Sequence, residues 1–372
     1  MRVALVAVIA ATFAVGAVSS APAPRPLLAL ELGDGPIDAP SHLVRLDPRT
    51  LEPREGGVRL PSWAFGFAAT WSPAGDAVAV VPKPDETNER LYLVDSATLR
   101  LRGRVPLRGR DVCVLAWPAR RTILALAGEN GCYNGQRSLL ALRIDPLAKR
   151  IVSQTAVPVD WSVDAVAAVP HGVAAVVRTR LVVFTTRGIR RATLPSASVP
   201  AAIASGSRGR IFVAGFDGSV AVLGPDGRVD VHRWRSTSSI AKGNTPTVSA
   251  AWLGGDVLAI GRGRLRGERN LPLGARLVDT RTWRSRSLDG SSLGVARAEE
   301  RVVVYGRDGL RLYSRAGRLL RRSLRGADVR WVRVRGRYAY AAEGTSADVV
   351  DLATGHETRG ADANLIYGLL LP

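Results

Sequence analysis

The chain has 372 residues, 46% of them hydrophobic and 23% charged, which provides a large core for one extended domain or two ordinary ones and excludes a disordered chain. The formal net charge is +20, and only three of the 52 basic residues are lysines, Lys83, Lys149 and Lys242, so 52 − 3 leaves 49 arginines. Arginine abundance with scarce lysine is typical of a GC-rich bacterial genome, which explains part of this excess. The charge favours polyanions as non-specific partners, such as anionic lipid surfaces, phosphate-rich wall polymers or nucleic acid.

The N-terminus has the pattern of a secretory signal peptide. Arg2 precedes an apolar stretch from Val3 to Val18, which is 16 residues and shorter than the ~20 of a comfortable membrane span. Small residues follow, and cleavage is expected after Ser19 or Ser20. The predicted organisation is therefore a signal peptide (1–20), a Pro-rich linker (21–26) and a single β-domain (27–372), in a secreted or envelope-associated protein. An uncleaved N-terminal anchor is the alternative.

The chain contains two cysteines, Cys113 and Cys132. In an exported protein an isolated pair is more often a disulfide than a metal site, and no histidine lies nearby to add ligands. The sequence therefore predicts a Cys113–Cys132 disulfide and no metal site.

In chain order, one four-strand pattern recurs. Before it begins, LLALEL, HLVRLDP and EGGVRLP read as the second, third and fourth strands of a unit without a first. ATWSPAGDAVAVV (69–81) and LYLVDSATLRLRGRVPL (91–107) then form a complete unit of two strands around a tight turn, a variable loop, a third strand ending in Asp, and a fourth strand. Six more copies begin near residues 114, 164, 201, 249, 293 and 329.

The last segment, ANLIYGLLLP (363–372), reads as a first strand with nothing after it. Joined to the three initial strands, it completes one more unit. Such four-stranded sheets cannot bury both faces alone, and stacking them around an axis buries the faces against each other. We therefore predict an all-β fold, a β-propeller of eight four-stranded blades closed by pairing of the N- and C-terminal segments, with seven blades as the alternative.

The unit at 69–81 and the Asp-terminated third strands, such as LVRLDPRT and LYLVDSAT, resemble the WD-repeat-like and YVTN-type β-propellers of exported bacterial proteins. The likeness covers the whole mature chain and implies the propeller fold. The chain departs from true WD repeats, because its third strands lack the Trp-Asp ending and no Gly-His pair precedes each blade.

Two residue types recur at fixed positions in the units. An aspartate at the end of a third strand is expected to accept backbone N–H groups in the following turn, and a tryptophan at the end of a first strand is expected to fill the wedge between blades. The residues concerned are Asp47, Asp95, Asp145, Asp279 and Asp351, and Trp71, Trp117 and Trp252.

The long insertions predict which face of the ring binds a ligand. Loops between second and third strands share one face with the connections between blades, and nearly all long insertions fall there, at 82–90, 128–137, 236–246 and 262–274. The other face carries only tight turns. Insertions gathered on one face are typical of a binding face in repeat folds, so Asn88, Asn134 and Asn244 in these loops are candidate ligand-binding residues.

Three arginines, Arg330, Arg333 and Arg335, are predicted on a first strand, the strand nearest the central channel. At the mouth of the channel they could bind a carboxylate or a phosphate. The alternative is a solvated or ion-paired arrangement, as expected for arginines on outer strands, where charge blocks edge-to-edge pairing.

The sequence favours an exported, non-enzymatic binding or scaffold module that acts through its loop-rich face, without cofactor or catalytic residues. Its partner would be a protein, a wall polymer or an anionic ligand, with peripheral contact to an anionic membrane, no specific nucleic acid, and a monomeric state. The alternative is a propeller enzyme, such as a lactonase-like hydrolase or a lyase, with its active site at the channel mouth. Candidate carboxylates for that alternative are Asp85, Glu86, Glu129, Asp217 and Glu343, with Asp111 and Asp164 near the starts of first strands.

Overall fold

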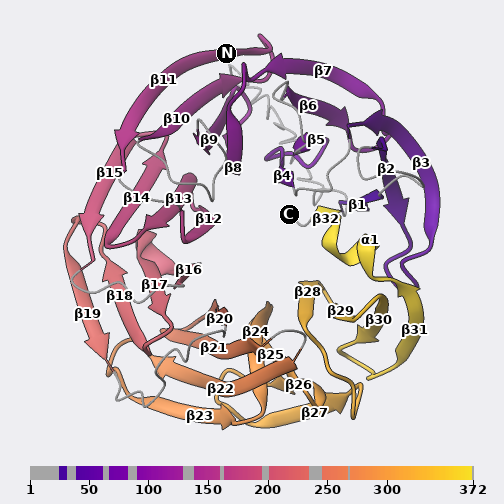
Figure 1. Cartoon of the computed structure of the whole chain (residues 1–372), viewed down its shortest axis with the longest axis vertical. Coiled ribbons are helices and arrows are strands. Elements are labelled where there is room, and N and C mark those ends of the chain that lie inside the picture. The colour runs from indigo at the N-terminus through magenta and orange to yellow at the C-terminus, as the bar shows by residue number, and fades with distance from the viewer. Residues whose placement is uncertain are drawn as a thin grey trace, which may run out of the picture.

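The computed structural model is a ring of eight four-stranded antiparallel sheets around a central channel (Figure 1). It describes residues 25–31, 39–61, 67–82, 90–128, 138–159, 163–194, 201–233, 245–266 and 269–370. The β-propeller with eight blades is confirmed, and the seven-blade alternative is wrong. Among the described helices, none has the length and apolar character needed to cross a bilayer.

The first four blades, each given from its innermost to its outermost strand, follow the chain. Blade 1 contains β32 (Leu369–Leu370), β1 (Leu27–Glu31), β2 (Ser41–Leu46) and β3 (Pro53–Leu60). Blade 2 contains β4 (Phe67–Trp71), β5 (Ala77–Pro82), β6 (Arg90–Asp95) and β7 (Leu101–Pro106). Blade 3 contains β8 (Asp111–Ala119), β9 (Thr122–Gly128), β10 (Ser138–Asp145) and β11 (Arg150–Pro158). Blade 4 contains β12 (Ala165–Val169), β13 (Gly172–Val177), β14 (Arg180–Thr185) and β15 (Gly188–Thr193).

The remaining four blades complete the ring. Blade 5 contains β16 (Ala201–Ser205), β17 (Ile211–Gly215), β18 (Ser219–Leu223) and β19 (Val229–Arg233), with a 3₁₀ turn at Ser207–Gly209. Blade 6 contains β20 (Thr245–Gly254), β21 (Val257–Arg266), β22 (Arg269–Asp279) and β23 (Ser285–Asp289). Blade 7 contains β24 (Ser292–Ala298), β25 (Arg301–Gly306), β26 (Gly309–Tyr313) and β27 (Leu319–Ser323). Blade 8 contains β28 (Trp331–Arg335), β29 (Tyr338–Glu343), β30 (Ser346–Asp351) and β31 (Glu357–Asp362).

The apolar core is divided into eight clusters, one at each interface between neighbouring blades. All six residues of β5 and of β13 are buried, because these second strands are covered on both faces. Where blades 6 and 7 meet, the backbones approach so closely that a Cβ on Gly261 would lie 2.6 Å from the Cα of Gly294, which requires glycine there. The blades therefore depend on one another for burial, as the repeat pattern predicts.

The C-terminal segment departs from the predicted first strand. Its first half is a short helix, α1 (Ala363–Tyr367), and only β32 is extended. The side chain of Asp362 caps the helix by accepting a hydrogen bond from the Asn364 N–H. Within the helix, Leu365 and Ile366 are buried. A helical turn allows the chain to cross from the outer strand of blade 8 to the innermost position of blade 1.

The two ends of the chain meet in blade 1. Leu28 of β1 lies opposite Leu370 of β32, and Ala29 lies opposite Leu369. The Trp71 Nε1–H of blade 2 donates to the Leu370 carbonyl at 3.0 Å. That this short pairing is what holds the ring shut stays a prediction.

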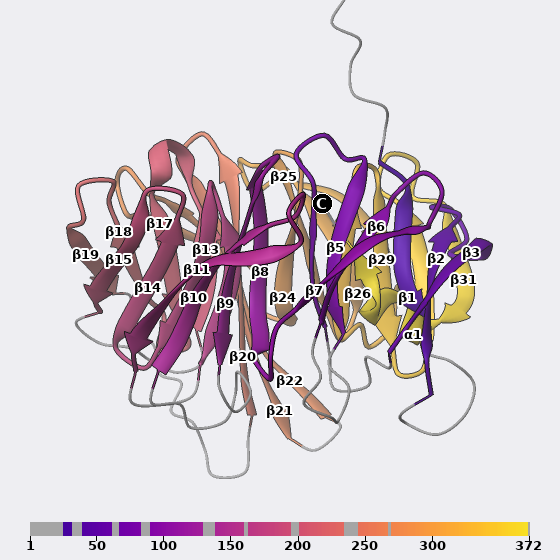
Figure 2. The same cartoon turned by 90° about the horizontal axis from the view of Figure 1, so that it is seen from above.

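One of the predicted long loops is instead a β-hairpin. Residues 262–274 were expected as an insertion, but β21 and β22 continue through most of this range and pair as far as Arg266 opposite Arg269. Figure 2 shows the hairpin extending beyond the other strands of the ring. Two strands that pair over this length satisfy their own backbone groups, so an arginine- and glycine-rich sequence forms a ladder, with one shift of register between Arg262 and Gly263.

The recurrent aspartates and tryptophans behave as predicted. Each of the five aspartates accepts backbone N–H groups from the turn that follows, for example Asp95 from Ala97 at 2.9 Å and from Thr98 at 2.7 Å, and the same contact is made by Asp47, Asp145, Asp279 and Asp351. Trp252 is 7% exposed and stacks on Phe212 of the neighbouring blade with ring centroids 5.1 Å apart. These residues fix the turns and fill the interfaces.

Arginines connect the outer parts of neighbouring blades, a role that the sequence analysis did not anticipate. At five interfaces an arginine on a third or fourth strand donates to a carbonyl in the turn between the third and fourth strands of the next blade. The donors and acceptors are Arg45 to Ala97, Arg143 to Thr186, Arg190 to Gly224, Arg286 to Ala316, and Arg321 to Ala353 and Thr354. We name these contacts the arginine latches.

Replacing Arg321 by alanine tests the latches. The change removes two hydrogen bonds between blades 7 and 8, and because they are solvent-exposed we expect the free energy of unfolding to fall by only about 1 kcal/mol. Urea unfolding followed by tryptophan fluorescence measures the change. Arg318→Ala is the control, because in the described structure the Arg318 side chain is exposed and makes no ion pair. Equal midpoints for the two variants would contradict a stabilising role.

The turn aspartates predict a stability that depends on pH. Burial raises the pKa of Asp95, but the Thr98 N–H, the Arg102 side chain and the Ala97 N–H outweigh it and lower the pKa from 3.8 to about 2. A lowered folded-state pKa contributes stability above the unfolded value, and this stability is lost as the pH falls from about 4 towards 2. Asp95→Asn should therefore cost about 2 kcal/mol at neutral pH and progressively less over that acidic window. Urea unfolding at a series of pH values measures this, with the exposed Asp230→Asn as control, and a pH-independent cost would refute it.

Candidate functional site

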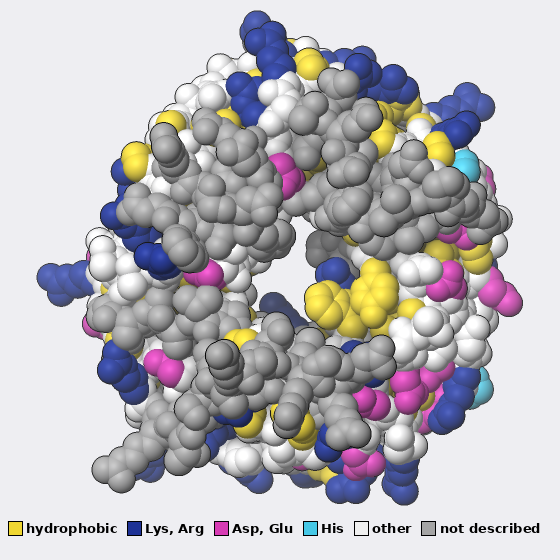
Figure 3. Space-filling view, viewed as in Figure 1, with side chains coloured by type: hydrophobic (Ala, Val, Ile, Leu, Met, Phe, Trp, Pro, Cys, Tyr) yellow, Lys and Arg dark blue, Asp and Glu magenta, His cyan; other side chains and the backbone are white. Residues whose placement is uncertain are grey.

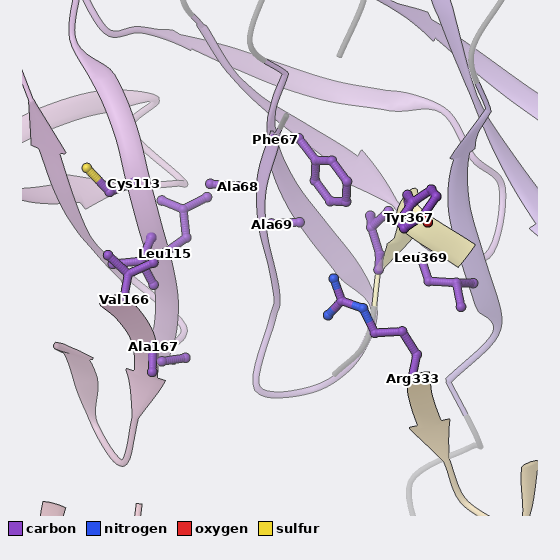
Figure 4. A pocket seen from close by; sticks show the side chains of 13 residues that line it. Phe67, Ala68, Ala69, Cys113, Leu115, Val166, Ala167, Arg333, Tyr367 and Leu369 are labelled. Carbon is purple, nitrogen blue, oxygen red and sulfur yellow. The ribbon is translucent and has the colours of Figure 1, made fainter. Parts of the chain in front are cut away.

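A cavity of about 420 Å³ opens on the central channel. It is formed by the innermost strands of blades 2, 3, 4 and 8 together with the segment that runs from α1 into β32. The lining side chains are apolar or uncharged with one exception, Arg333 of β28. Figure 4 shows the Arg333 side chain pointing from β28 into the space beside Phe67 and Ala69 of β4.

The strand pleat places Arg333 in the channel. In β28, Val332 and Val334 pack into the core between blades 7 and 8, so the alternate residues Trp331, Arg333 and Arg335 lie on the opposite side. The buried Nε of Arg333 has no hydrogen-bond acceptor among the described residues. Burial lowers the pKa of its guanidinium. A partly desolvated cation without a counter-charge among the described residues offers its donors to an anion that enters this cavity.

A buried tyrosine lies behind Arg333. Tyr305 of β25 reaches past Gly294 of the innermost strand, and a Cβ on that glycine would lie 2.2 Å from the Tyr305 hydroxyl. Burial raises the Tyr305 pKa to about 12, although a hydrogen bond with Ser249 and the charge of Arg333 lower it. The hydroxyl is therefore neutral at physiological pH and does not neutralise the guanidinium.

Two aromatic rings stand beside the channel mouth. Trp331 is 43% exposed and Tyr367 is 37% exposed, unusually large values for side chains of this size, and their ring centroids lie 6.3 Å apart with the planes tilted by 58°. The Arg333 guanidinium lies over the Trp331 ring, 5.4 Å from its centroid. Figure 3 shows hydrophobic side chains gathered at the channel mouth over β28 and α1, next to a basic side chain. We call Trp331, Arg333 and Tyr367 the channel triad.

The structure separates the three arginines that the sequence placed together. Arg330 precedes β28, and its Nε lies 3.9 Å from an Asp328 carboxylate oxygen. Arg335 donates to the Pro26 carbonyl at 2.7 Å and thereby connects blade 8 to the residue before β1. Of the three, Arg333 lines the cavity.

The loop candidates lie mostly outside the described residues. This holds for Asn88, Asn134 and Asn244, for Cys132, and for the carboxylates Asp85, Glu86 and Glu129. The disulfide and the asparagine site therefore stay predictions. Among the described residues, no group of His, Cys, Asp and Glu is arranged to hold a metal ion.

Three of the described candidate carboxylates hold loops. Asp217 accepts from the Ser219 N–H and hydroxyl, and Glu343 accepts from the Asp328 N–H at 3.0 Å. Asp164 accepts from the Arg178 N–H at 2.6 Å, and burial raises the Asp164 pKa. Their positions are explained by local structure.

Sequence reasoning missed the aromatic part of the site. Trp331 stands between two of the arginines in VRWVRVR, and this alternation on an inner strand could have indicated that the ring and Arg333 share a face. The position of Tyr367 could not be predicted, because the sequence of its segment has the pattern of a strand and the segment forms a helix. Phe67 comes from a blade more than two hundred residues away, so only the closed ring brings it to Arg333.

A larger cavity of about 600 Å³ lies between blades 4 and 5 on the face of tight turns. Arg187, Arg190 and Arg208 line it. Arg190 already donates to the Gly224 carbonyl at 2.6 Å as one of the arginine latches, and Arg187 and Arg208 are exposed to solvent. We favour the channel cavity, because its cation is partly desolvated and has no hydrogen-bond acceptor in the described structure.

The comparisons with known proteins show the fold alone. No family model and no curated protein match the sequence. The structure is similar to that of the dihydro-heme d1 dehydrogenase NirN in complex with DHE, with a TM-score of 0.59 and 15% identity over 91% of this chain and 74% of that one. It is also similar to apo AztD from Citrobacter koseri (TM-score 0.53, 13% identity, 91% and 95% covered) and to BamB from Moraxella catarrhalis (0.50, 12%, 90% and 94%). At these identities the WD-repeat-like or YVTN-type assignment stays a prediction.

Proposed function

We propose that this chain is an exported, non-enzymatic binding module that holds its ligand at the channel mouth on the loop-rich face. The observation that carries the proposal is the channel triad, in which a half-buried guanidinium, without a hydrogen-bond acceptor among the described residues, lies beside two exposed aromatic rings. Concave sites with apolar walls and few polar groups are typical of ligand binding. In repeat folds, loops gathered on one face are typical of the surface that contacts a ligand.

Binding is favoured over catalysis by the chemistry of the cavity walls. Acid–base or metal chemistry needs titratable groups that converge on one reacting atom. In the described part of the cavity lining, the ionisable side chains are Arg333 and Tyr367, since Cys113 belongs to the predicted disulfide, and no carboxylate or imidazole accompanies them. The enzyme alternative is addressed by the same experiment as the binding proposal.

A thermal-shift screen with small metabolites tests the proposal. We expect at least one compound to raise the melting temperature of the wild type, because a ligand that binds only the folded state stabilises it by mass action. Trp331→Ala and Tyr367→Ala should lose most of this shift, since they remove the rings of the triad. Leu147→Ala is the matched control, an exposed apolar residue (55%) in a tight turn of blade 3.

Two results would contradict the proposal. A compound that stabilises all four proteins alike binds elsewhere on the molecule. A compound that is chemically converted during incubation, as followed by NMR, points to the enzyme alternative.

Export is supported by the predicted signal peptide (1–20), whose residues lie outside the described structure, and by the Cys113–Cys132 pair. Cys113 lies near the start of β8, and residue 132 follows β9 in the sequence of the same blade. A bridge between them would therefore brace the loop that follows β9 at the loop-rich face. Such a bridge would stabilise the fold by about 3 kcal/mol on a chain-entropy argument.

A thiol assay tests the disulfide. Unfolded, unreduced protein collected from the cell envelope or medium should show no reactive thiols, and reduction should release both. The Cys113→Ser variant should then show one thiol without reduction. Two thiols in the unreduced wild type would refute the bridge.

A further inference from the structure

The Arg333 side chain is half-buried, and its guanidinium faces the cavity without a compensating charge among the described residues. No described carboxylate pairs with it, its Nε has no acceptor, and its Tyr305 neighbour is neutral. Other arginines with a buried, unbonded Nε, such as Arg45 and Arg210, donate through a terminal nitrogen to a described acceptor, Arg45 to the Ala97 carbonyl and Arg210 to the Asp256 carboxylate. Arg333 has no such contact in the described structure, so its donors are available to an acceptor on a ligand that enters the cavity.

The charge of the cavity limits the charge of that ligand. Arg333 is the one cation among the described lining residues, and the other side chains there are neutral. A carboxylate carries one negative charge and matches one guanidinium fork. A phosphate monoester carries close to two charges and three acceptor oxygens, which would require further donors.

The walls of the cavity indicate the chemistry of the part of the ligand that does not contact Arg333. Phe67, Ala69, Leu115 and Val166 form apolar surfaces that hydrogen-bond nothing through their side chains. The rings of Trp331 and Tyr367 stand at the rim, 6.3 Å apart between centroids, a spacing at which aromatic groups interact with one another. A flat apolar group entering at the mouth would contact these rings while its acidic end reached Arg333.

We infer that the ligand of this site is a small monocarboxylate with a flat apolar body, whose carboxylate binds Arg333 and whose body lies against Trp331 and Tyr367. This inference rests on the function proposed above and adds the chemical class of the ligand. Tyr305 is a positioning residue in this arrangement, because it lies behind the guanidinium and holds the wall between blades 6 and 7 through Ser249.

Matched acid and amide pairs test the charge requirement directly. The probes are indoleacetate with indoleacetamide, phenylacetate with phenylacetamide, and hexanoate with hexanamide, titrated into the full mature protein and followed by ligand-observed NMR. We expect each acid to bind about tenfold or more tightly than its amide, the ratio that one charge-assisted hydrogen bond provides. The aromatic acids should bind more tightly than hexanoate.

Two variants localise the effect. Arg333→Gln should remove the preference for acid over amide, because it keeps a polar side chain but removes the charge. Arg330→Gln is the matched control on the same blade, outside the cavity lining, and should keep the preference. Because the acid and amide are also compared on the wild type, the test does not depend on how well a variant folds.

The outcomes separate this inference from the proposed function. Equal affinity for acid and amide, with both weakened by Trp331→Ala, overturns the carboxylate assignment and leaves the binding site standing. A preference that survives in Arg333→Gln also overturns it. Tighter binding of phenyl phosphate than of phenylacetate would replace the monocarboxylate by a dianion. Failure of all probes to bind would overturn the inference, while the metabolite screen would still decide the proposed function.

Discussion

The constraint on which the whole structure depends is that no blade can bury both of its faces alone. Each four-stranded sheet has two apolar faces, and its core consists of the two clusters that it shares with its neighbours. A linear stack would leave one apolar face exposed at each end, whereas a ring leaves none. The channel follows from this closure, because the innermost strands then surround an axis and direct alternate side chains towards it.

The arginine latches add directional contacts to this non-directional core. The acceptor carbonyls belong to turns between third and fourth strands. Two of these turns are held by the recurrent aspartates: Asp95 holds the turn that receives Arg45, and Asp351 holds the turn that receives Arg321. The long arginine side chain can span the widening gap between the outer parts of two blades. Its planar guanidinium presents several donors to the carbonyls, whereas lysine carries one compact ammonium group. Part of the large arginine content therefore has a structural role at the periphery.

The sequence was sufficient to predict the fold, because the evidence for it is local and repeated. Alternating apolar strands, tight turns and strand-terminal aspartates each lie within one blade, and the strands of the two chain ends supply the eighth. The errors arose where one segment departs from the repeat: α1 is capped by Asp362 and packs as a helix, and β21 and β22 continue as a ladder through a stretch that resembles a loop. The site was only partly predictable, since the sequence indicated Arg333 but could not show that Arg335 is satisfied by the Pro26 carbonyl.

A ring with eight packed interfaces can tolerate a cation that has no counter-charge among the described residues. The cost of partly desolvating Arg333 is offset by a fold that is stabilised at every interface, and the side chain faces a channel that is not needed for the packing of the blades. Ligand binding would relieve this cost, so the same feature that lowers the stability of the empty protein would contribute affinity. Arg333 lies on an inner strand between Val332 and Val334, which pack into the core between blades 7 and 8. Its strand is therefore in place before a ligand arrives, which reduces the entropy lost on binding.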